Sequence, residues 1–459
     1  MDTVESALAA LSDFLWGPPL ITLIVGGGLF FLFYSRGLPY RYFGHAIQIL
    51  RGKYDHPHDP GDINHFQALS AALSGTLGLG NIAGVAVAIT LGGPGAIFWM
   101  WVTAVVGVAT KFFTCTLSIL YRGPDSLGKL QGGPMYIIRE GLGRRWIPLA
   151  MFFCVAALFG TLPIFQINQL TEALRDAILV PQGVLAEESI GLFNLTFGLA
   201  VAAVVAAVVF GGIPRVGYVA ARLVPSMVVI YLICAAVILA VNIDQIPGYL
   251  AMIFSDAFTG MAVAGGILGA MMVGVRQGAF SNEAGIGTEV MAHGAARTRE
   301  PVREGLVAML GPMIDTLIVC TCTALVILVT GAWQVGEGMA GAALTAQAFA
   351  NALGGIGPWI VTLLVVVFSA STMFTFWYYG AKSLGFLIGA EHQHWYKYFY
   401  VALIVVGAVV SLEVVIYLIT TMYGLMAIPT MIATLLLAPR VMTVTRIYLR
   451  QLEDGVHDK

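Results

Sequence analysis

The residue types best suited to binding a ligand lie in a glycine-rich interruption of one apolar segment. This segment, residues 67–90, reads QALSAALSGTLGLGNIAGVAVAIT. The glycines at its middle are Gly75, Gly78 and Gly80. Glycine lets the backbone leave a helix at low steric cost, and Thr76 and Asn81 supply uncharged oxygens at the break. Polar backbone at bilayer depth is tolerated only where protein buries it or where it lines a cavity, so this break predicts a binding site.

A second interrupted segment covers residues 264–296, AGGILGAMMVGVRQGAFSNEAGIGTEVMAHGAA, in which glycines and polar side chains break the apolar run between Gly274 and Gly287. Two interrupted hydrophobic segments at corresponding places in two halves of a chain indicate a transporter site made by discontinuous helices. The free N–H groups of a half-helix suit a carboxylate, and freed carbonyls and hydroxyls suit a hard cation such as Na⁺. The first break holds no acidic residue, which favours Na⁺ over a carboxylate proton relay.

The composition indicates an integral membrane protein. Of 459 residues, 58% are hydrophobic and 10% are charged, and the mean hydropathy is +0.86, whereas about a quarter of the residues of a soluble globular protein are charged. The length suits about eleven helical spans of roughly 20 residues each with short loops. The formal net charge of −2 suggests neither a nucleic-acid partner nor a polyanion-binding face. The expected fold class is an all-α membrane protein.

The apolar runs define eleven expected spans, of which the second and the seventh are the interrupted ones. They cover residues 19–34, 67–90, 95–121, 146–173, 190–211, 216–241, 260–296, 302–330, 358–387, 396–419 and 421–446. Residues 1–16 have apolar positions at helical spacing, which predicts a short helix at the membrane interface. Lys and Arg concentrate after the odd-numbered spans, and only Arg175 clearly departs from this pattern. Because basic residues accumulate in cytoplasmic loops, we expect a multi-pass protein of the cell membrane, with its N-terminus outside and its C-terminus in the cytoplasm.

The spans fall into two halves if the first one is an addition. Residues 67–241 then hold five spans and residues 260–446 hold five more, each half opening with its interrupted segment. An odd number of spans gives the halves opposite orientations, which makes an inverted repeat. We expect one transporter domain over residues 1–459, in which residues 1–66 precede the repeats and residues 447–459 form a cytoplasmic tail.

Two other interpretations of the first break fit less well. The stretch GLGNIAG, residues 78–84, satisfies the dinucleotide-binding pattern G-x-G-x-x-A, but no strand precedes it and no acidic residue follows about twenty residues later. Small residues also let membrane helices pack closely. Three glycines within six residues, beside Ser74, Thr76 and Asn81, exceed what close packing requires.

Longer motifs carry a resemblance over almost the whole chain. They are SGTLGLGNIAGVAVAI at residues 74–89, GGPGAIFWMWV at 92–102, GGPMYIIREGLG at 132–143 and FSNEAGIG at 280–287. In these motifs the sequence resembles the alanine or glycine:cation symporter family of bacteria and archaea. The resemblance implies a LeuT-type fold, with a 5+5 inverted-repeat core after one extra helix, and sodium-coupled uptake of a small neutral amino acid.

The resemblance also implies which residues bind the substrate and the coupling ion. The substrate set combines the first break, a glutamine of the fourth span and the second break: Thr76, Gly78, Leu79, Gly80, Gln166, Phe280, Ser281 and Asn282. The Na⁺ set joins the first break to the FSAST stretch of the ninth span: Ser74, Leu77, Asn81, Phe368, Ser371 and Thr372. Taken alone, adjacent Ser and Thr usually bond the preceding helical turn, so the ion assignment depends on the resemblance. Family members often carry threonine at the position of Leu79, which bears on substrate selectivity, and Phe165 is a further candidate wall of the pocket.

Charged residues inside the spans need partners or a water-filled path. Glu283 in the second break has either an organising or a coupling role, and Arg276, seven residues earlier, is its candidate partner. Asp315 of the eighth span is either a functional group or a structural one that pairs helices. Lys111 is expected to extend toward the cytoplasmic interface. The histidines that follow the first span are expected to be solvated rather than metal-binding: His56, His58 and His65.

The favoured function is Na⁺-coupled symport of alanine, glycine or a similarly small neutral amino acid by alternating access. A proton-coupled carrier, or one for a larger amino acid such as glutamine, is an alternative within transport. A transporter-like amino-acid sensor is an alternative of another class. An enzyme fits least, because the spans contain no set of nucleophile and base and no cluster of metal ligands. We expect no cofactor besides the coupling ion Na⁺, and as partners the amino acid and the lipid bilayer, with no nucleic acid and no protein.

Overall fold

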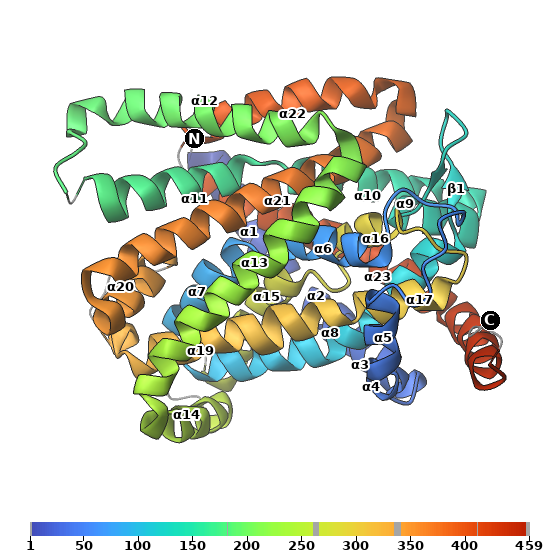
Figure 1. The fold of residues 1–459 in the computed structure, drawn as a ribbon, viewed down its shortest axis with the longest axis horizontal. Coiled ribbons are helices and arrows are strands. Elements are labelled where there is room, and N and C mark those ends of the chain that lie inside the picture. The colour runs from blue at the N-terminus through green and yellow to red at the C-terminus, as the bar shows by residue number, and fades with distance from the viewer. Residues whose placement is uncertain (1, 181, 260–265, 335–340, 411, 456–459) are drawn as a thin grey trace.

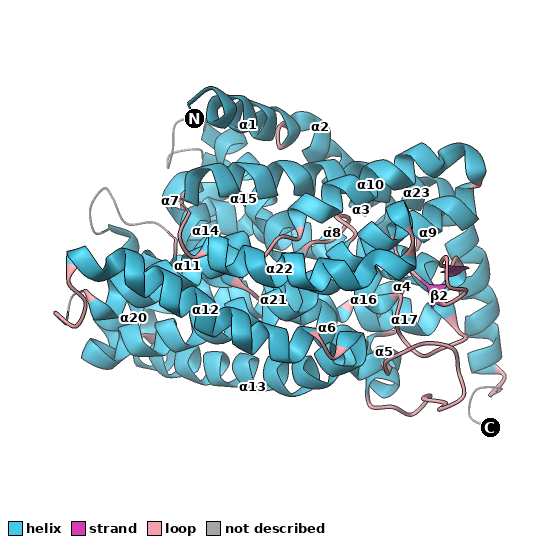
Figure 2. Ribbon diagram, turned by 90° about the horizontal axis from the view of Figure 1, so that it is seen from above, coloured by secondary structure: helices cyan, strands magenta, loops and turns pink. Residues whose placement is uncertain are grey.

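The computed structural model describes residues 2–180, 182–259, 266–334, 341–410 and 412–455. The structure is 83% helical, and Figures 1 and 2 show the long helices side by side, roughly along the long axis. Within the described residues, eight helices are long and apolar enough to cross a membrane, or up to nine if one bent pair counts as a span. The expected count of eleven is not confirmed, since α15 (Gly266–Asn282) has 17 residues and α22 (Gln393–Gly407) has 15, below the roughly 20 that a span requires.

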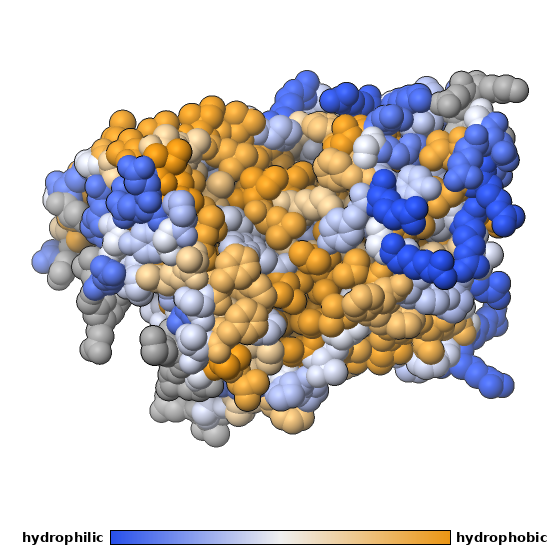
Figure 3. All heavy atoms as spheres, turned by 90° about the horizontal axis from the view of Figure 1, so that it is seen from below, coloured by the Kyte–Doolittle hydropathy of each residue, from blue (hydrophilic) through white to orange (hydrophobic). Residues whose placement is uncertain are grey.

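The outer surface is apolar where a bilayer would contact it. Figure 3 shows, on one face, a broad hydrophobic area between hydrophilic residues that gather toward the two ends. Large apolar side chains remain exposed on α12 (Ile190–Val209) and α13 (Gly212–Val241), among them Leu192 and Val241, which are 67% and 81% exposed. Soluble proteins rarely expose contiguous apolar areas of this kind. The chain is a multi-pass membrane protein.

The N-terminal helix α1 (Asp2–Leu15) packs on the C-terminal helix α23 (Leu412–Glu453). Ser12 Oγ lies 3.1 Å from Thr420 Oγ1, and Trp16 Nε1 donates to the Thr420 carbonyl over 2.8 Å. The expected N-terminal helix is present, and these contacts join it to protein. The elements that follow it are α2 (Pro18–Ile21), a π-helical turn (Thr22–Gly26), α3 (Gly27–Tyr34), α4 (Leu38–Arg41) and α5 (Phe43–Leu50).

The first interrupted segment is bent, as expected. Its first half, α6 (His65–Thr76), begins with a capping box in which the side chains of Asn64 and Gln67 each accept from the other residue's backbone N–H. The second half is a π-helical turn (Gly80–Gly84) followed by α7 (Val85–Gly92), and the two halves meet at 54°. The residues between the halves are the glycine-rich break.

The rest of the first half is helical apart from one small hairpin. Two-residue strands β1 (Gly123–Pro124) and β2 (Leu130–Gln131) pair antiparallel. A helix that the sequence analysis did not anticipate, α14, lies between the two halves of the chain and packs on α8. The remaining helices are α8 (Gly95–Leu120), α9 (Pro134–Tyr136), a π-helical turn (Ile137–Leu142), α10 (Ile147–Gly160), α11 (Ile164–Leu174), a second π-helical turn (Arg175–Leu179), α12, α13 and α14 (Ile246–Thr259).

The second half opens with α15, and the second break separates it from α16 (Thr288–His293). Residues 260–265 of the expected seventh span lie outside the described residues. The expected tenth span, residues 396–419, is wrong at its end, because α22 ends at Gly407 and α23 begins at Leu412 inside an apolar run that hydropathy does not divide. The other helices are α17 (Pro301–Ala308), α18 (Leu310–Pro312), a π-helical stretch (Met313–Cys320), α19 (Thr321–Val329), α20 (Ala342–Leu353), α21 (Gly357–Ile388), α22 and α23.

Glycines bring α15 close to α8. A Cβ on Gly274 would lie 2.3 Å from the carbonyl oxygen of Ala96, and a Cβ on Gly278 would lie 2.1 Å from Thr103 Oγ1. Glycines four residues apart let the backbones of membrane helices approach closely. This packing holds the last turns of α15, and with them the second break, against the first half of the chain.

Candidate substrate and cation site

The two breaks lie directly against each other. A Cβ on Gly80 would lie 3.4 Å from Ser281 Cα and 3.6 Å from Phe280 Cδ1. The flanking half-helices α6 and α16 also pack together, near the centre of Figure 1. The interrupted segments of the two halves therefore form one centre, as the sequence predicts.

A small pocket of about 20 Å³ lies at this centre. Six of the residues that the resemblance assigns to the substrate line it: Thr76, Gly78, Leu79, Gly80, Gln166 and Phe280. The other lining residues are Gly75, Phe165, Glu283, Thr372, Phe376 and Tyr423. A cavity needs about 10–15 Å³ to hold one water molecule, so in this conformation the pocket has space for little more than one water, and an amino acid requires it to widen.

Two polar atoms at this pocket have no partner within the described part of the chain. They are Thr76 Oγ1 and Gln166 Oε1, and both side chains are buried. Buried polar atoms in folded proteins nearly always have a hydrogen-bond partner. The N–H groups at the start of the half-helix Gly80–Gly92 lie at the positive end of the helix dipole, and of these the Asn81 N–H donates to the Gly78 carbonyl over 3.2 Å. The pocket therefore offers unused hydrogen-bonding groups and an end suited to a carboxylate.

Three other polar residues of the two breaks, Asn81, Ser281 and Asn282, belong to a second polar cluster around Asp315. Its carboxylate accepts from Asn81 Nδ2 over 2.5 Å and from Ser281 Oγ over 2.8 Å. Asn282 Nδ2 donates to Thr316 Oγ1, whose hydroxyl donates in turn to Asp315. Asp315 is fully buried and joins both breaks. The structure thus places the side chains of Asn81, Ser281 and Asn282 in this cluster, and their roles toward ion and substrate stay predictions.

Uncharged oxygens gather where α21 passes the first break. Ser371 Oγ lies 3.3 Å from the Ser74 carbonyl and 2.9 Å from the Phe368 carbonyl, and Thr372 Oγ1 lies 3.0 Å from the same Phe368 carbonyl. Leu77, also assigned to the ion, is fully buried at the end of α6. A Cβ on Gly78 would lie 2.8 Å from Thr372 Oγ1. Carbonyls of unwound helices and neighbouring hydroxyls are the type of ligand that holds Na⁺ in such transporters, so these residues fit a sodium ion.

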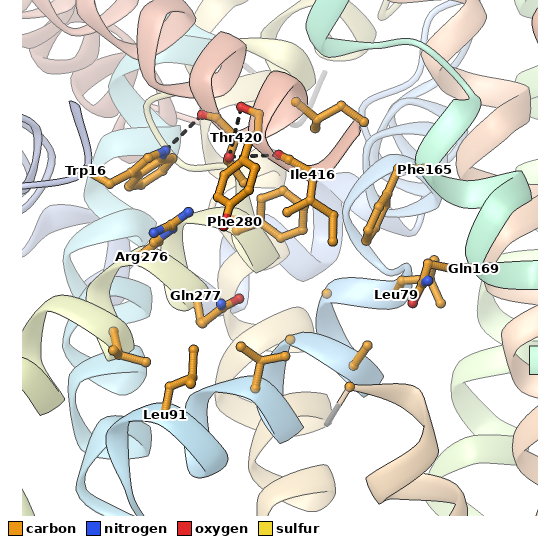
Figure 4. A pocket seen from close by; sticks show the side chains of 18 of the residues that line it. Trp16, Leu79, Leu91, Phe165, Gln169, Arg276, Gln277, Phe280, Ile416 and Thr420 are labelled. Carbon is orange, nitrogen blue, oxygen red and sulfur yellow. Dashed lines mark hydrogen bonds between the residues drawn. The ribbon is translucent and has the colours of Figure 1, made fainter. Parts of the chain in front are cut away.

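A larger pocket of about 480 Å³ adjoins the small one. The two share Leu79, Gly80, Phe165 and Phe280 among their lining residues. The rings of Phe165 and Phe280 meet edge to face, with centroids 6.2 Å apart. Figure 4 shows Arg276 and Phe280 on one side of the large pocket and Phe165 and Gln169 on the other. These two aromatic rings therefore lie where the two pockets adjoin.

The predicted pairing of Arg276 with Glu283 is wrong. Arg276 Nη1 lies 3.3 Å from Asp13 Oδ1 and Nη2 lies 3.2 Å from Ser12 Oγ, so α1 supplies the partner. Glu283 stands beyond the end of α15 in a left-handed conformation, with φ at 55°. Its carboxylate instead accepts from the Tyr423 hydroxyl over 2.9 Å and from the Thr288 hydroxyl.

Polar contacts link the ends of α6, α16 and α17. Glu304 accepts from His293 Nδ1 over 2.5 Å and also contacts His65 Nδ1. Arg122 Nε donates to the Gly294 carbonyl over 2.9 Å, and Lys382 Nζ donates to the Gly132 carbonyl over the same distance. His65 is 1% exposed, so the expectation of a solvated side chain is wrong for it, while His56 and His58 are exposed. His65 differs because it lies in the first turn of α6, which packs inward.

Lys111 does not extend to the interface. Its side chain is 1% exposed, and a Cβ on Gly311 would lie 3.2 Å from its Nζ. The glycine leaves room for the ammonium group inside the helix bundle, and the buried carboxylates of Glu283 and Glu289 interact with it electrostatically. The predicted position of Lys111 at the interface is wrong because the space beside Gly311 and the carboxylates of Glu283 and Glu289 are provided by segments distant in sequence.

Comparison with known proteins decides the family. The profile of the sodium:alanine symporter family matches residues 1–459. The chain belongs to this family. Its members are symporters, so the chain is a transporter and not an enzyme.

Two curated relatives of the sodium:alanine symporter family cover nearly the whole chain. The sodium/alanine symporter AgcS of Methanococcus maripaludis is 40% identical over 98% of each chain. The probable sodium/glutamine symporter GlnT of Bacillus subtilis is 35% identical over 98% of this chain and 92% of its own. The solved structure of MhsT in complex with L-phenylalanine matches with a TM-score of 0.55, at 12% identity, over 85% of this chain and 99% of that one. This last likeness concerns the fold and supports the LeuT-type architecture that the sequence predicts.

Proposed function

We propose that the chain imports a small neutral amino acid, alanine or glycine, together with Na⁺ by alternating access. The observation that carries the proposal is the small pocket where the two breaks meet. Thr76 Oγ1 and Gln166 Oε1, which have no partner within the described residues, line this pocket together with Thr372. The relative AgcS is a sodium/alanine symporter, which supports the same substrate and ion.

In this proposal, the substrate carboxylate binds at the start of the half-helix Gly80–Gly92, the positive end of the helix dipole. The Thr76 hydroxyl donates to this carboxylate, Gln166 Oε1 accepts from the amino group of the substrate, and Phe280 forms a wall. Ser281 and Asn282 act from beside the pocket, since their bonds to Asp315 and Thr316 hold the second break in place.

The ion binds between the first break and α21. Its ligands are the carbonyls of Ser74, Leu77 and Phe368 and the hydroxyls of Ser371 and Thr372. Asn81 contributes indirectly, because its Oδ1 accepts from the Gly78 N–H over 3.0 Å while its amide donates to Asp315. Na⁺ and substrate thus contact opposite sides of the same few residues, and a ligand that orders this break favours binding of the other.

We further propose the orientation and the repeat arrangement that the sequence predicts. The large pocket on the α1 side then opens to the outside, and the Glu304 contacts close the cytoplasmic side. Residues 67–241 and 260–446 form the two inverted repeats of one transporter domain, with residues 1–66 before them and 447–459 as a cytoplasmic tail. Transport by alternating access requires that the outer side close and the cytoplasmic side open in turn.

A larger substrate is the second candidate. The name of GlnT, a probable sodium/glutamine symporter, and the adjoining pocket of about 480 Å³ both favour it. Uptake of radiolabelled alanine into proteoliposomes, with NaCl or choline chloride outside and unlabelled glycine, serine or glutamine as competitors, tests the proposal. We expect Na⁺-dependent uptake that glycine blocks. Block by glutamine alone would favour the second candidate. Proton-driven uptake in choline chloride would show that the coupling ion is H⁺ and not Na⁺. Binding of alanine without uptake would indicate a sensor.

A further inference from the structure

One carboxylate, that of Glu283, lines the small pocket. Among the described residues that border this pocket, Glu283 is the only one with an acidic or basic side chain. It is 2% exposed, and its φ of 55° is a left-handed value that few residues other than glycine adopt. Gly285 and Gly287, on the same break, also have positive φ values, of 87° and 101°. The second break is thus built as a sharp left-handed turn that sets Glu283 at the pocket.

The Glu283 carboxylate retains unused hydrogen-bonding capacity. Tyr423 and Thr288 each donate one hydrogen bond to it, and an ionised carboxylate offers about four acceptor positions. A carboxylate inside a membrane protein is costly, and it typically faces a cavity or a pathway and pairs with a cation. An ammonium group in the pocket would find acceptor positions here.

The buried charges around Glu283 favour the binding of one more cation. Lys111 interacts electrostatically with both Glu283 and Glu289. One lysine against two carboxylates leaves an excess of negative charge when all three are ionised. A neutral amino acid carries an ammonium group of the required sign, and its own carboxylate has a separate place at the positive end of the half-helix Gly80–Gly92.

We propose that Glu283 binds the α-ammonium group of the transported amino acid. This rests on the proposed function and assigns one further residue of the same site. The two breaks then bind the two charged groups of the substrate: the first break binds the carboxylate and the second binds the ammonium group. Glu283 would therefore reject acids that lack the amino group, such as propionate and lactate, which the first break alone cannot tell from alanine.

The test compares ligands with and without the ammonium group. Purified wild type and Glu283→Gln are assayed for displacement of radiolabelled alanine by unlabelled alanine and by propionate in saturating Na⁺. We expect wild type to bind alanine at least about 100-fold more tightly than propionate, and Glu283→Gln to lose about 10- to 100-fold in alanine affinity with little change for propionate. Glu289→Gln is the comparison variant, because it removes the same charge beside Lys111 from an equally buried position that does not line the pocket. Its alanine-to-propionate ratio should fall less than that of Glu283→Gln.

Several results would overturn the assignment. If propionate competes for the wild-type site almost as well as alanine does, the assignment is refuted by the wild type alone. An unchanged alanine-to-propionate ratio in Glu283→Gln, including an equal loss of both ligands, assigns Glu283 a structural role. If Glu283→Gln does not fold, Glu283→Asp replaces it: this variant keeps the charge, so it should bind alanine more weakly and still reject propionate, and loss of rejection contradicts the proposal. Failure of wild type to take up alanine with Na⁺ would instead refute the proposed function.

Discussion

Replacing Thr372 by valine removes one oxygen from the proposed ion site and keeps the shape of the side chain. Thr372 Oγ1 lies 3.0 Å from the Phe368 carbonyl and borders Gly78 in the first break. A polar contact to a charged partner contributes about 1.5–3 kcal/mol, which corresponds to roughly a 10- to 150-fold change in a binding constant. We expect the Na⁺ concentration for half-maximal alanine uptake to rise by a factor in this range. The maximal rate at saturating Na⁺ should change less.

The assay is the initial rate of alanine uptake into proteoliposomes over a series of Na⁺ concentrations, with choline keeping the ionic strength constant. Thr375→Val is the matched control, because Thr375 is buried on the same helix and its hydroxyl has no partner within the described part of the chain. It should leave the Na⁺ dependence unchanged. If Thr372→Val transports alanine with wild-type Na⁺ dependence, the assignment of the ion site is refuted.

Three further substitutions follow from the packing. Gly78→Ala places a Cβ 2.8 Å from Thr372 Oγ1, so Na⁺-dependent uptake should be lost while the protein stays monodisperse by size exclusion; wild-type uptake would contradict this. Gly274→Ala places a Cβ 2.3 Å from the Ala96 carbonyl and should destabilise the protein by about 1–3 kcal/mol, seen as a lower melting temperature in detergent, whereas Gly191→Ala, which meets no atom within 4 Å, should melt like wild type. Glu304→Gln disrupts the buried contacts to His65 and His293 and should cost about 3–5 kcal/mol; an unchanged melting temperature would show that this cluster does not hold the closed side together.

The two breaks could be predicted because each leaves a local mark in the sequence. Glycines and polar residues interrupt a run that is otherwise apolar, and the structure shows the bend at Thr76 and the turn after Asn282 where the marks stand. The individual ligands proposed on the first break, such as Leu79 and Gly80, were assigned through the resemblance to the family. The pairing of the breaks followed from the correspondence of the two halves.

The contacts between distant residues could not be predicted in this way. Arg276 pairs with Asp13 of α1 rather than with its sequence neighbour Glu283, because the choice depends on how α1 crosses the bundle. Lys111 is buried because Gly311, two hundred positions later, leaves room for it. Tyr423, which donates to Glu283, lies in an ordinary apolar helix with no motif around it. Each of these contacts depends on tertiary packing, which hydropathy and residue spacing do not predict.

The most direct test of the central claim, that Na⁺ and the amino acid bind to opposite sides of one break, is the alanine affinity of the purified protein at rising Na⁺ concentration. We predict that Na⁺ tightens alanine binding, that alanine tightens Na⁺ binding by the same factor, and that Thr372→Val shifts this effect to higher Na⁺. An alanine affinity that is the same in NaCl and in choline chloride would contradict the claim.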